Sequence, residues 1–209
     1  MKYIYLPLML TLLLIGCKSY EKAMEIPQEI STEIPQDTIY DWMYCYNGNE
    51  YAAKGDYERA IANYDAAIRL NPDFDLAYNK RGEAYAKKGD YDSAIANYDT
   101  AIEISPGYTD AYLNRANAYK KKNDYEQAIA DYNKLIIQNP RSSQMLFLRG
   151  RAYINMGNYN KAIADFDKIM EEFPTNSYGI YSHRGFAYFM IGNYNQAISD
   201  FKKSSRKKP

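Results

Sequence analysis

The sequence has few of the residues on which most catalytic and metal sites depend. Its 209 residues include one histidine, two cysteines and one tryptophan. No charge of one sign dominates, because 26 lysines and arginines balance 26 aspartates and glutamates. A balanced chain creates no global field that would attract nucleic acid. We therefore expect no nucleic-acid partner, no metal and no cofactor.

Motifs of common enzymes are missing as well. The chain contains no G-x-x-x-x-G-K-[ST] phosphate loop, no C-x-x-C and no H-E-x-x-H. A Cys/His pair for nucleophilic catalysis needs hydrogen-bond contact, whereas Cys45 and His183 lie near opposite ends of the chain. The sequence therefore predicts a protein that is not an enzyme.

A long hydrophobic run is also missing. Lys2 is followed by an apolar stretch over Tyr3–Ile15, which is shorter than the roughly 20 residues of a membrane-spanning helix. The stretch ends in Leu14-Ile15-Gly16-Cys17, which resembles a bacterial lipobox. That resemblance implies removal of the signal peptide 1–16, a palmitate-type lipid anchor on Cys17 and, with Lys18 next, the outer membrane if the organism is Gram-negative. An ordinary signal peptide with a cysteine at its cleavage site is the alternative.

Residues 17–40 are expected to form the lipidated cysteine and an extended tether. Two similar stretches there, 25–28 and 33–36, read Glu-Ile-Pro-Gln and show no helical apolar period. If Cys17 carries lipid, Cys45 has no disulfide partner within the chain. The folded part must then be held together by packing alone.

The remaining residues, 41–209, repeat with a period of 34. Prolines recur at that spacing, at Pro72, Pro106, Pro140 and Pro174. Small residues form one column, at Gly48, Gly82, Ala116, Gly150 and Gly185. Aromatic residues form another, at Tyr64, Tyr98, Tyr132, Phe166 and Phe201. Seventeen of the 24 tyrosines fall in four such columns, so we interpret them as scaffold.

This pattern resembles the tetratricopeptide repeat (TPR) family. The resemblance implies an all-α, right-handed superhelical solenoid of about five helix-turn-helix repeats, at 41–74, 75–108, 109–142, 143–176 and 178–209. Glycine or asparagine ends the first helix of each repeat, and Asp or Asn caps the second. Asp75, Thr109 and Ser143 are expected to cap the following first helices.

An arginine recurs at the seventh position of four repeats, at Arg81, Arg115, Arg149 and Arg184. Because it keeps step with the scaffold columns, we interpret this ladder as structural. The guanidinium groups are expected to reach acids on neighbouring helices, at Asp65, Asp99, Asp131 and Asp165.

The family resemblance implies that the first helices line a concave groove. Read onto this chain, the predicted groove contains Asn79, Lys80, Glu83, Lys87, Asn114, Asn117, Lys121, Phe147, Arg151, His183, Phe186 and Phe189. The same positions also include Trp42, Cys45, Lys120 and Met190. Five basic and two acidic groove residues contrast with the net negative charge of the remaining scaffold.

These features predict a membrane-anchored adaptor that binds a partner protein or peptide with acidic and apolar residues. Exposed apolar patches usually mark contact sites. Two alternatives remain, a cell-envelope enzyme and a homo-oligomeric structural lipoprotein. Zymography of the purified chain and light scattering at several concentrations would reveal them.

The lipid anchor gives the first testable prediction. Cys17→Ser removes the thiol that would carry lipid, so the protein should leave the detergent phase and keep its signal peptide. Phase partitioning and the mass of the chain measure both effects. A variant that still fractionates with membranes at high salt would show that the lipobox assignment is wrong.

Overall fold

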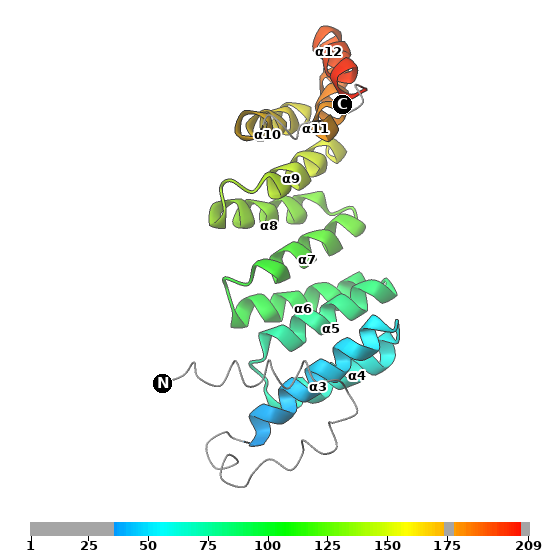
Figure 1. Ribbon diagram of the computed structural model, residues 1–209, viewed down its shortest axis with the longest axis vertical. Helices are drawn as coiled ribbons and strands as arrows, with labels where there is room; N and C mark the ends of the chain where they lie inside the picture. The colour runs from blue at the N-terminus through cyan, green and yellow to red at the C-terminus, as the bar shows by residue number, and fades with distance from the viewer. Residues whose placement is uncertain (1–35, 174–177, 206–209) are drawn as a thin grey trace.

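The computed structural model describes residues 36–173 and 178–205, which form α-helices and no strand. The helices are α3 (Gln36–Ala53), α4 (Tyr57–Leu70), α5 (Asp75–Lys88), α6 (Tyr91–Ile104), α7 (Thr109–Lys121), α8 (Tyr125–Gln138), α9 (Ser143–Asn155), α10 (Tyr159–Glu172), α11 (Tyr178–Met190) and α12 (Tyr194–Ser204). Consecutive helices pack as antiparallel pairs that stack along one axis (Figure 1). The predicted all-α solenoid is confirmed. The predicted signal peptide and Cys17 lie outside the described residues.

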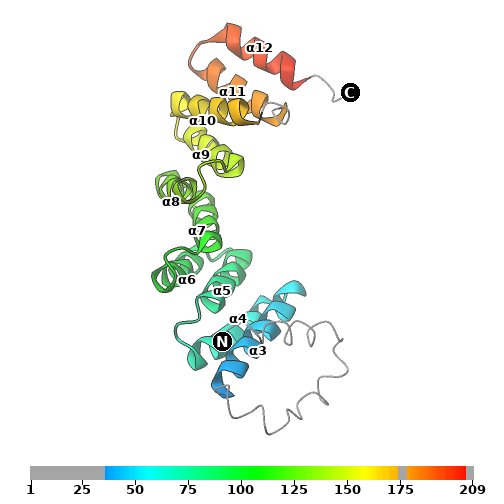
Figure 2. The same cartoon turned by 60° about the vertical axis from the view of Figure 1, so that its left-hand side comes forward.

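Each repeat contributes an A helix (α3, α5, α7, α9 or α11) and a B helix (α4, α6, α8, α10 or α12). The stack is bowed, with α6 and α8 on its outer side and α5 and α7 on its inner side (Figure 2). A helices contact one another along the inner side, as α3 with α5 and α5 with α7. The concave face is therefore built from A helices.

The turn inside each pair has the backbone that the sequence predicts. A residue with positive φ follows each A helix, directly after α5 and two residues beyond the last residue of the others, at Gly55, Gly89, Asn123, Gly157 and Gly192. Only residues that tolerate the left-handed region can end a helix in this way. The next residue caps the B helix, as when Asp56 accepts a hydrogen bond from the Arg59 N–H. Asn158 is the exception, because its side chain makes no such bond.

Small residues let the two helices of a pair approach closely. A Cβ atom added to Gly82 would lie 2.6 Å from Cε1 of Tyr98, and one added to Gly150 would lie 2.7 Å from Cε1 of Phe166. Such distances are inside van der Waals contact, so the aromatic ring occupies the place of the missing side chain. The ring column is almost fully buried in the first four repeats and holds each pair together.

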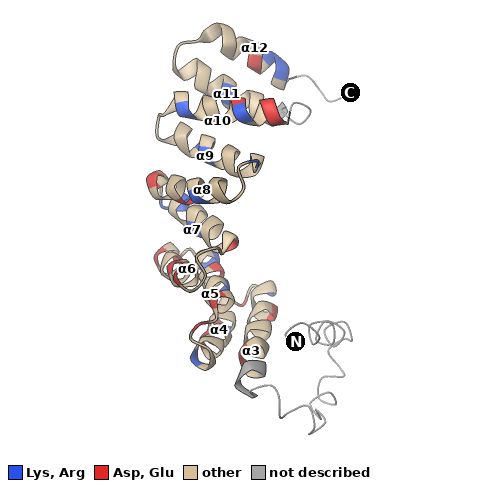
Figure 3. Cartoon of the chain, turned by 90° about the vertical axis from the view of Figure 1, so that its left-hand side faces the viewer, with Lys and Arg blue, Asp and Glu red and all other residues tan. Residues whose placement is uncertain are grey.

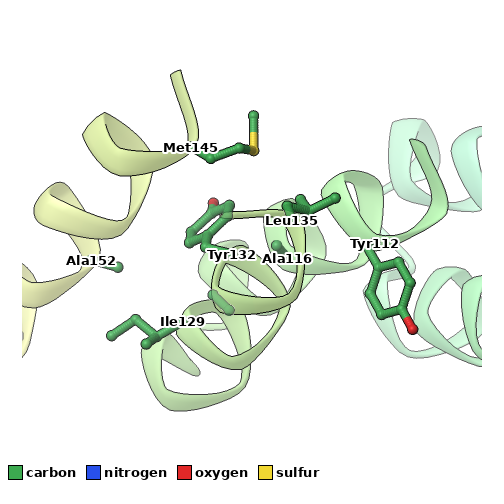
Figure 4. Packing of buried hydrophobic residues seen from close by; sticks show 8 residues of the cluster. Tyr112, Ala116, Ile129, Tyr132, Leu135, Met145 and Ala152 are labelled. Carbon is green, nitrogen blue, oxygen red and sulfur yellow. The ribbon is translucent and has the colours of Figure 1, made fainter. Parts of the chain in front are cut away.

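Contacts between one pair of helices and the next also combine large and small apolar side chains. Tyr132 and Ile129 of α8 face Met145 and Ala152 of α9 (Figure 4). These side chains form one continuous apolar cluster with Leu135, which is 2% exposed. Each repeat therefore buries its B helix beneath the A helix of the next repeat, as expected for a solenoid.

The arginine ladder connects the pairs by hydrogen bonds. Arg115 donates from Nη1 to Oδ1 of Asp99 on the preceding B helix at 2.6 Å, and from Nη2 to Oδ1 of Asp131 on its own B helix at 2.6 Å. Arg81 binds Asp65, and Arg149 binds Asp165 at 2.5 Å. These pairs confirm the predicted structural role of the ladder. A planar guanidinium that is hydrogen-bonded on two sides fixes the relative position of neighbouring helix pairs.

Two local expectations were wrong. The N-caps of α5, α7 and α9 are Phe74, Tyr108 and Ser142, one residue before the expected caps. Asp75, instead of capping α5, accepts a hydrogen bond from the Ser105 hydroxyl at the end of α6. Thr109 and Ser143 are likewise the first residues of their helices. Because the proline-containing loop is compact, its last residue takes the cap position.

The first helix also begins earlier than expected. α3 starts at Gln36, inside the segment 17–40 that was predicted to be an extended tether. The residues 36–40 contain no proline or glycine, so nothing in this stretch of sequence interrupts a helix. The period of 34 does not extend to these residues, so the repeat pattern could not reveal them.

The close packing within pairs predicts a sharp difference between two alanines of α8. Ala128 is completely buried, whereas Ala130 is exposed on the same helix. Ala128→Leu should overpack the core and lower the free energy of unfolding by about 1–3 kcal/mol. Ala130→Leu should change it by less than about 0.5 kcal/mol. Denaturant titration measures both, and equal losses would show that the assigned packing face is wrong.

The buried thiol of Cys45 gives a second prediction. Its side chain is 1% exposed within the core of the first repeat, and burial raises its pKa to about 11. Because the thiolate is the reactive species, Cys45 in the Cys17→Ser chain should react with a thiol reagent at pH 8 at least about a hundredfold more slowly in the folded protein than in denaturant. Similar rates in both states would mean that the first repeat is open.

Candidate functional site

The concave face contains a polar network between the second and third repeats. Asn79 donates to Oε1 of Glu83 at 3.0 Å, and Asn114 donates to Oδ1 of Asn79 at 3.1 Å and to Oε1 of Glu83 at 3.2 Å. Lys80 places Nζ 3.1 Å from both oxygens of Glu83. Four A-helix residues are thus joined into one unit across α5 and α7. The Glu83 carboxylate neutralises the Lys80 charge.

A hollow lies beside this network, between the first and second repeats. Its volume is about 330 Å³, and its lining consists of Asn49, Ala52, Tyr57, Tyr64, Lys80, Glu83, Ala84 and Lys87. The Tyr64 hydroxyl donates to Oδ1 of Asn49 at 2.8 Å. Lys87 is exposed at the edge of the hollow and takes part in no ion pair among the described residues. The hollow thus combines an aromatic wall with a cation at its rim.

Positive charge gathers one repeat further along, on α7 and α9. Lys120 donates to Oδ1 of Asn117 at 3.2 Å. Partial burial, together with the nearby charges of Arg151 and Lys121, lowers the pKa of Lys120. Within the described part of the chain, none of these three cations forms an ion pair. This cluster, Lys120, Lys121 and Arg151, is called the cationic cluster below.

Aromatic side chains border the cationic cluster on its C-terminal side. The Arg151 guanidinium lies over the Phe147 ring, 5.7 Å from its centroid. Phe147 in turn packs edge-on against His183, with ring centroids 5.0 Å apart. The His183 Nδ1 lies 3.0 Å from the carbonyl oxygen of Gly179. The only histidine of the chain is therefore held between an aromatic ring and its own helix.

A second hollow opens between α9 and α11. It measures about 260 Å³ and is lined by Arg151, Ile154, Asn155, Ser182, His183 and Phe186. Beyond it, α11 leaves large apolar side chains in solvent. Phe186 is 42% exposed, Phe189 52% and Met190 44%. Along the A helices, the cationic cluster is therefore followed by this hollow and then by the exposed apolar residues.

The structure differs from the sequence-based groove at specific residues. Cys45 and Asn79 are each 1% exposed, so they cannot contact a partner directly. Tyr57, Tyr64 and Ser182, which line the two hollows, were not predicted. Tyr57 and Tyr64 were assigned wholly to the scaffold, although rings in those columns also border the groove. The i, i+3 spacing of Lys80 and Glu83 was the signal that this lysine is paired.

No group of three or more potential metal ligands occurs in the described ranges 36–173 and 178–205. Within those ranges, no helix combines the length and the hydrophobicity needed to cross a bilayer.

Comparison with known proteins identifies the repeats. Family models described as TPR repeat and tetratricopeptide repeat match residues 48–89, 82–123 and 113–177. No curated protein matches the sequence significantly. Similar folds occur in a crystal structure of MamA, which is 24% identical with a TM-score of 0.72 and covers 79% of this chain and 90% of its own.

Two further solved structures share the fold. MamA from Desulfovibrio magneticus RS-1 is 20% identical, with a TM-score of 0.72 and coverage of 79% of this chain and 93% of its own. YrrB, described as a TPR protein with an unusual peptide-binding site, is 22% identical, with a TM-score of 0.68 and coverage of 77% and 82%. Because the family models together match more than half of its 209 residues, from 48 to 177, the chain belongs to the tetratricopeptide repeat family.

Proposed function

We propose that this protein is a lipid-anchored adaptor that holds a segment of a partner protein in its concave groove. The observation that carries the proposal is the order of groups along the A helices. The cationic cluster on α7 and α9 lies beside the hollow that Phe186 borders, and Phe189 and Met190 follow. A segment with acidic residues at one end and large apolar residues at the other complements this order.

The charge of the cationic cluster favours an anionic partner. Elsewhere in the described scaffold, cations such as Arg115 and Arg184 are paired with aspartates. Lys120 instead has two cations, Arg151 and Lys121, nearby, and their repulsion lowers the pKa of Lys120 further than burial alone. A carboxylate placed among them would relieve this repulsion. Such groups on a concave surface also raise the rate of encounter with an acidic ligand.

The apolar residues of α11 supply the second part of the contact. Phe186 lies 6.4 Å from Tyr159, centroid to centroid, and its ring is partly open to the hollow. Aromatic side chains in such positions are common binding hot spots, because a partner can remove them completely from water. The solved structure of YrrB, a TPR protein with a peptide-binding site, supports peptide binding as a property of this kind of solenoid.

The anchor rests on the lipobox-like sequence 14–17. Residues 18–35, between Cys17 and the first helix, could reach about 60 Å if fully extended. A tether of that length would let the groove bind partners at the surface of the membrane. Lipidation with two or more acyl chains would make the attachment stable. The adaptor would then raise the local concentration of its partner at the membrane.

The role of the groove cations can be tested on a partner recovered with the native protein by cross-linking. Lys87→Glu combined with Lys121→Glu should slow association about tenfold and reduce its salt dependence, with little effect on dissociation. The matched control is Arg69→Glu with Lys134→Glu, which makes the same charge change at exposed sites on B helices. Biolayer interferometry at several salt concentrations separates the two rates. If both variants slow association equally, the effect of charge is long-range and does not depend on the groove.

The role of the apolar residues is separable from that of charge. Phe186→Ala should speed dissociation, with a loss on the order of 2 kcal/mol in binding free energy. Ile137→Ala, which truncates a side chain that is 76% exposed on α8, serves as the control and should have no effect. Circular dichroism should be unchanged in both variants. Normal binding by the Phe186 variant and by the double-lysine variant would exclude the concave groove as the binding surface.

A further inference from the structure

The last described helix, α12, exposes a face against which the following A helix packs in each earlier repeat. Ile129 of α8 and Ile163 of α10 are each 8% exposed, whereas the equivalent Ile198 of α12 is 52% exposed. The aromatic column behaves in the same way. Phe166 is 0% exposed and Phe201 is 41% exposed. Tyr194, at 58%, extends this apolar face toward the start of α12.

The contacts between each B helix and the A helix of the next repeat, here called the inner junctions, show which kind of helix fits against such a face. On α8, Ile129 and Tyr132 pack against Met145 and Ala152 of the following A helix (Figure 4). Four alanines recur in the incoming A helices where they meet the B helix, at Ala84, Ala118, Ala152 and Ala187. The face of α12 repeats the B-helix half of this junction. Its complement is therefore a helix with a small residue at its centre.

Charge distinguishes the α12 face from the inner junctions. Each incoming A helix brings an arginine that binds an acceptor on the preceding B helix, as Arg115 binds Asp99 and Arg184 binds Asp167. The acceptor column contains Asp65, Asp99, Asn133 and Asp167 and continues at Lys202. Lys202 is exposed, and the basic end of α12 is visible in Figure 3. A sixth repeat of the same kind would bring its arginine against this lysine.

We propose that the α12 face is a second docking surface, which binds a helix of another protein with apolar residues and an acidic residue opposite Lys202. The apolar contacts repeat those of the inner junctions. The ion pair has reversed polarity, with the cation on α12 and the carboxylate on the incoming helix. This reversal excludes the arginine-bearing A helices of the chain itself and favours a distinct acidic helix. The surface adjoins the apolar end of the groove, because the Tyr194 ring lies 5.7 Å from that of Phe189, centroid to centroid.

A second copy of the chain fits this face poorly. The helix that would stack there is α3, whose outer face carries Glu50 in the column where Ala84 and the other inner alanines are 0–2% exposed. A glutamate has no room in that column. In addition, Asn47 of α3 stands in the arginine column and supplies no carboxylate for Lys202. The geometry therefore favours a partner of different sequence.

A charge-swap experiment tests the proposal with defined probes. The probes are labelled peptides of residues 74–88, held helical by a lactam bridge on their exposed side, with Arg81 either kept or changed by Arg81→Glu. Fluorescence anisotropy with the full chain should show about tenfold tighter binding of the Arg81→Glu peptide. The Lys202→Glu chain should invert this preference, because it restores the polarity of the Arg81–Asp65 pair. Ile198→Asp should abolish binding of both peptides.

The controls separate this surface from its alternatives. The groove variant Lys87→Glu with Lys121→Glu should leave peptide binding unchanged, which keeps this test independent of the proposed adaptor function. A peptide with Ala84→Glu added should not bind, since it imitates α3. Failure of both peptides to bind, or a preference that Lys202→Glu does not invert, would overturn the proposal. Sedimentation that shows a dimer of the full chain, lost in Ile198→Asp, would overturn it in favour of self-association.

Discussion

The structure depends on one packing constraint, an aromatic ring pressed against a helix that has no side chain at that point. At Gly48, Gly82 and Gly150, a Cβ atom would come within 3 Å of the ring of the paired B helix. This contact sets the distance between the helices of a pair. It also leaves the rim of the ring at the concave face, so that Tyr64 both builds the core and lines a hollow. Scaffold and candidate binding surface are therefore not separate sets of residues.

The arginine ladder determines how the pairs stack. Each guanidinium connects its own B helix to the preceding one, as Arg184 does with Asp200 and Asp167 at 2.7 and 2.5 Å. A partly buried ion pair adds little net stability, but a misplaced layer would leave its charges unpaired. We interpret the ladder as a device that specifies register. Hydrophobic burial supplies the driving force, while the ladder keeps the A helices aligned along the groove.

Alignment of the A helices gives the concave face its directional character. From α5 to α11 it changes from a neutral polar network to unpaired cations and then to exposed aromatic residues. The two ends of the helix stack also differ, with a polar outer face at α3 and an apolar outer face at α12. The outer face of α3 carries the polar Asn47 and Glu50, while that of α12 carries Ile198 and Phe201. The graded groove and the unlike ends are the features on which the two proposed binding surfaces rest.

The sequence by itself determined the period, the helix pairs, the turns and four of the acids that bind the arginine ladder. These features depend on contacts between positions at fixed spacing, and a repeat displays that spacing five times. Only the tertiary structure decided which side chains are accessible. Cys45 and Asn79 occupy groove positions in the period, yet neighbouring helices cover them almost completely. The exposure of Ile198 was equally hidden, because an isoleucine in that column looks the same whether or not another layer covers it. Burial depends on what packs from outside the repeat, and a local spacing rule contains no information about that neighbour.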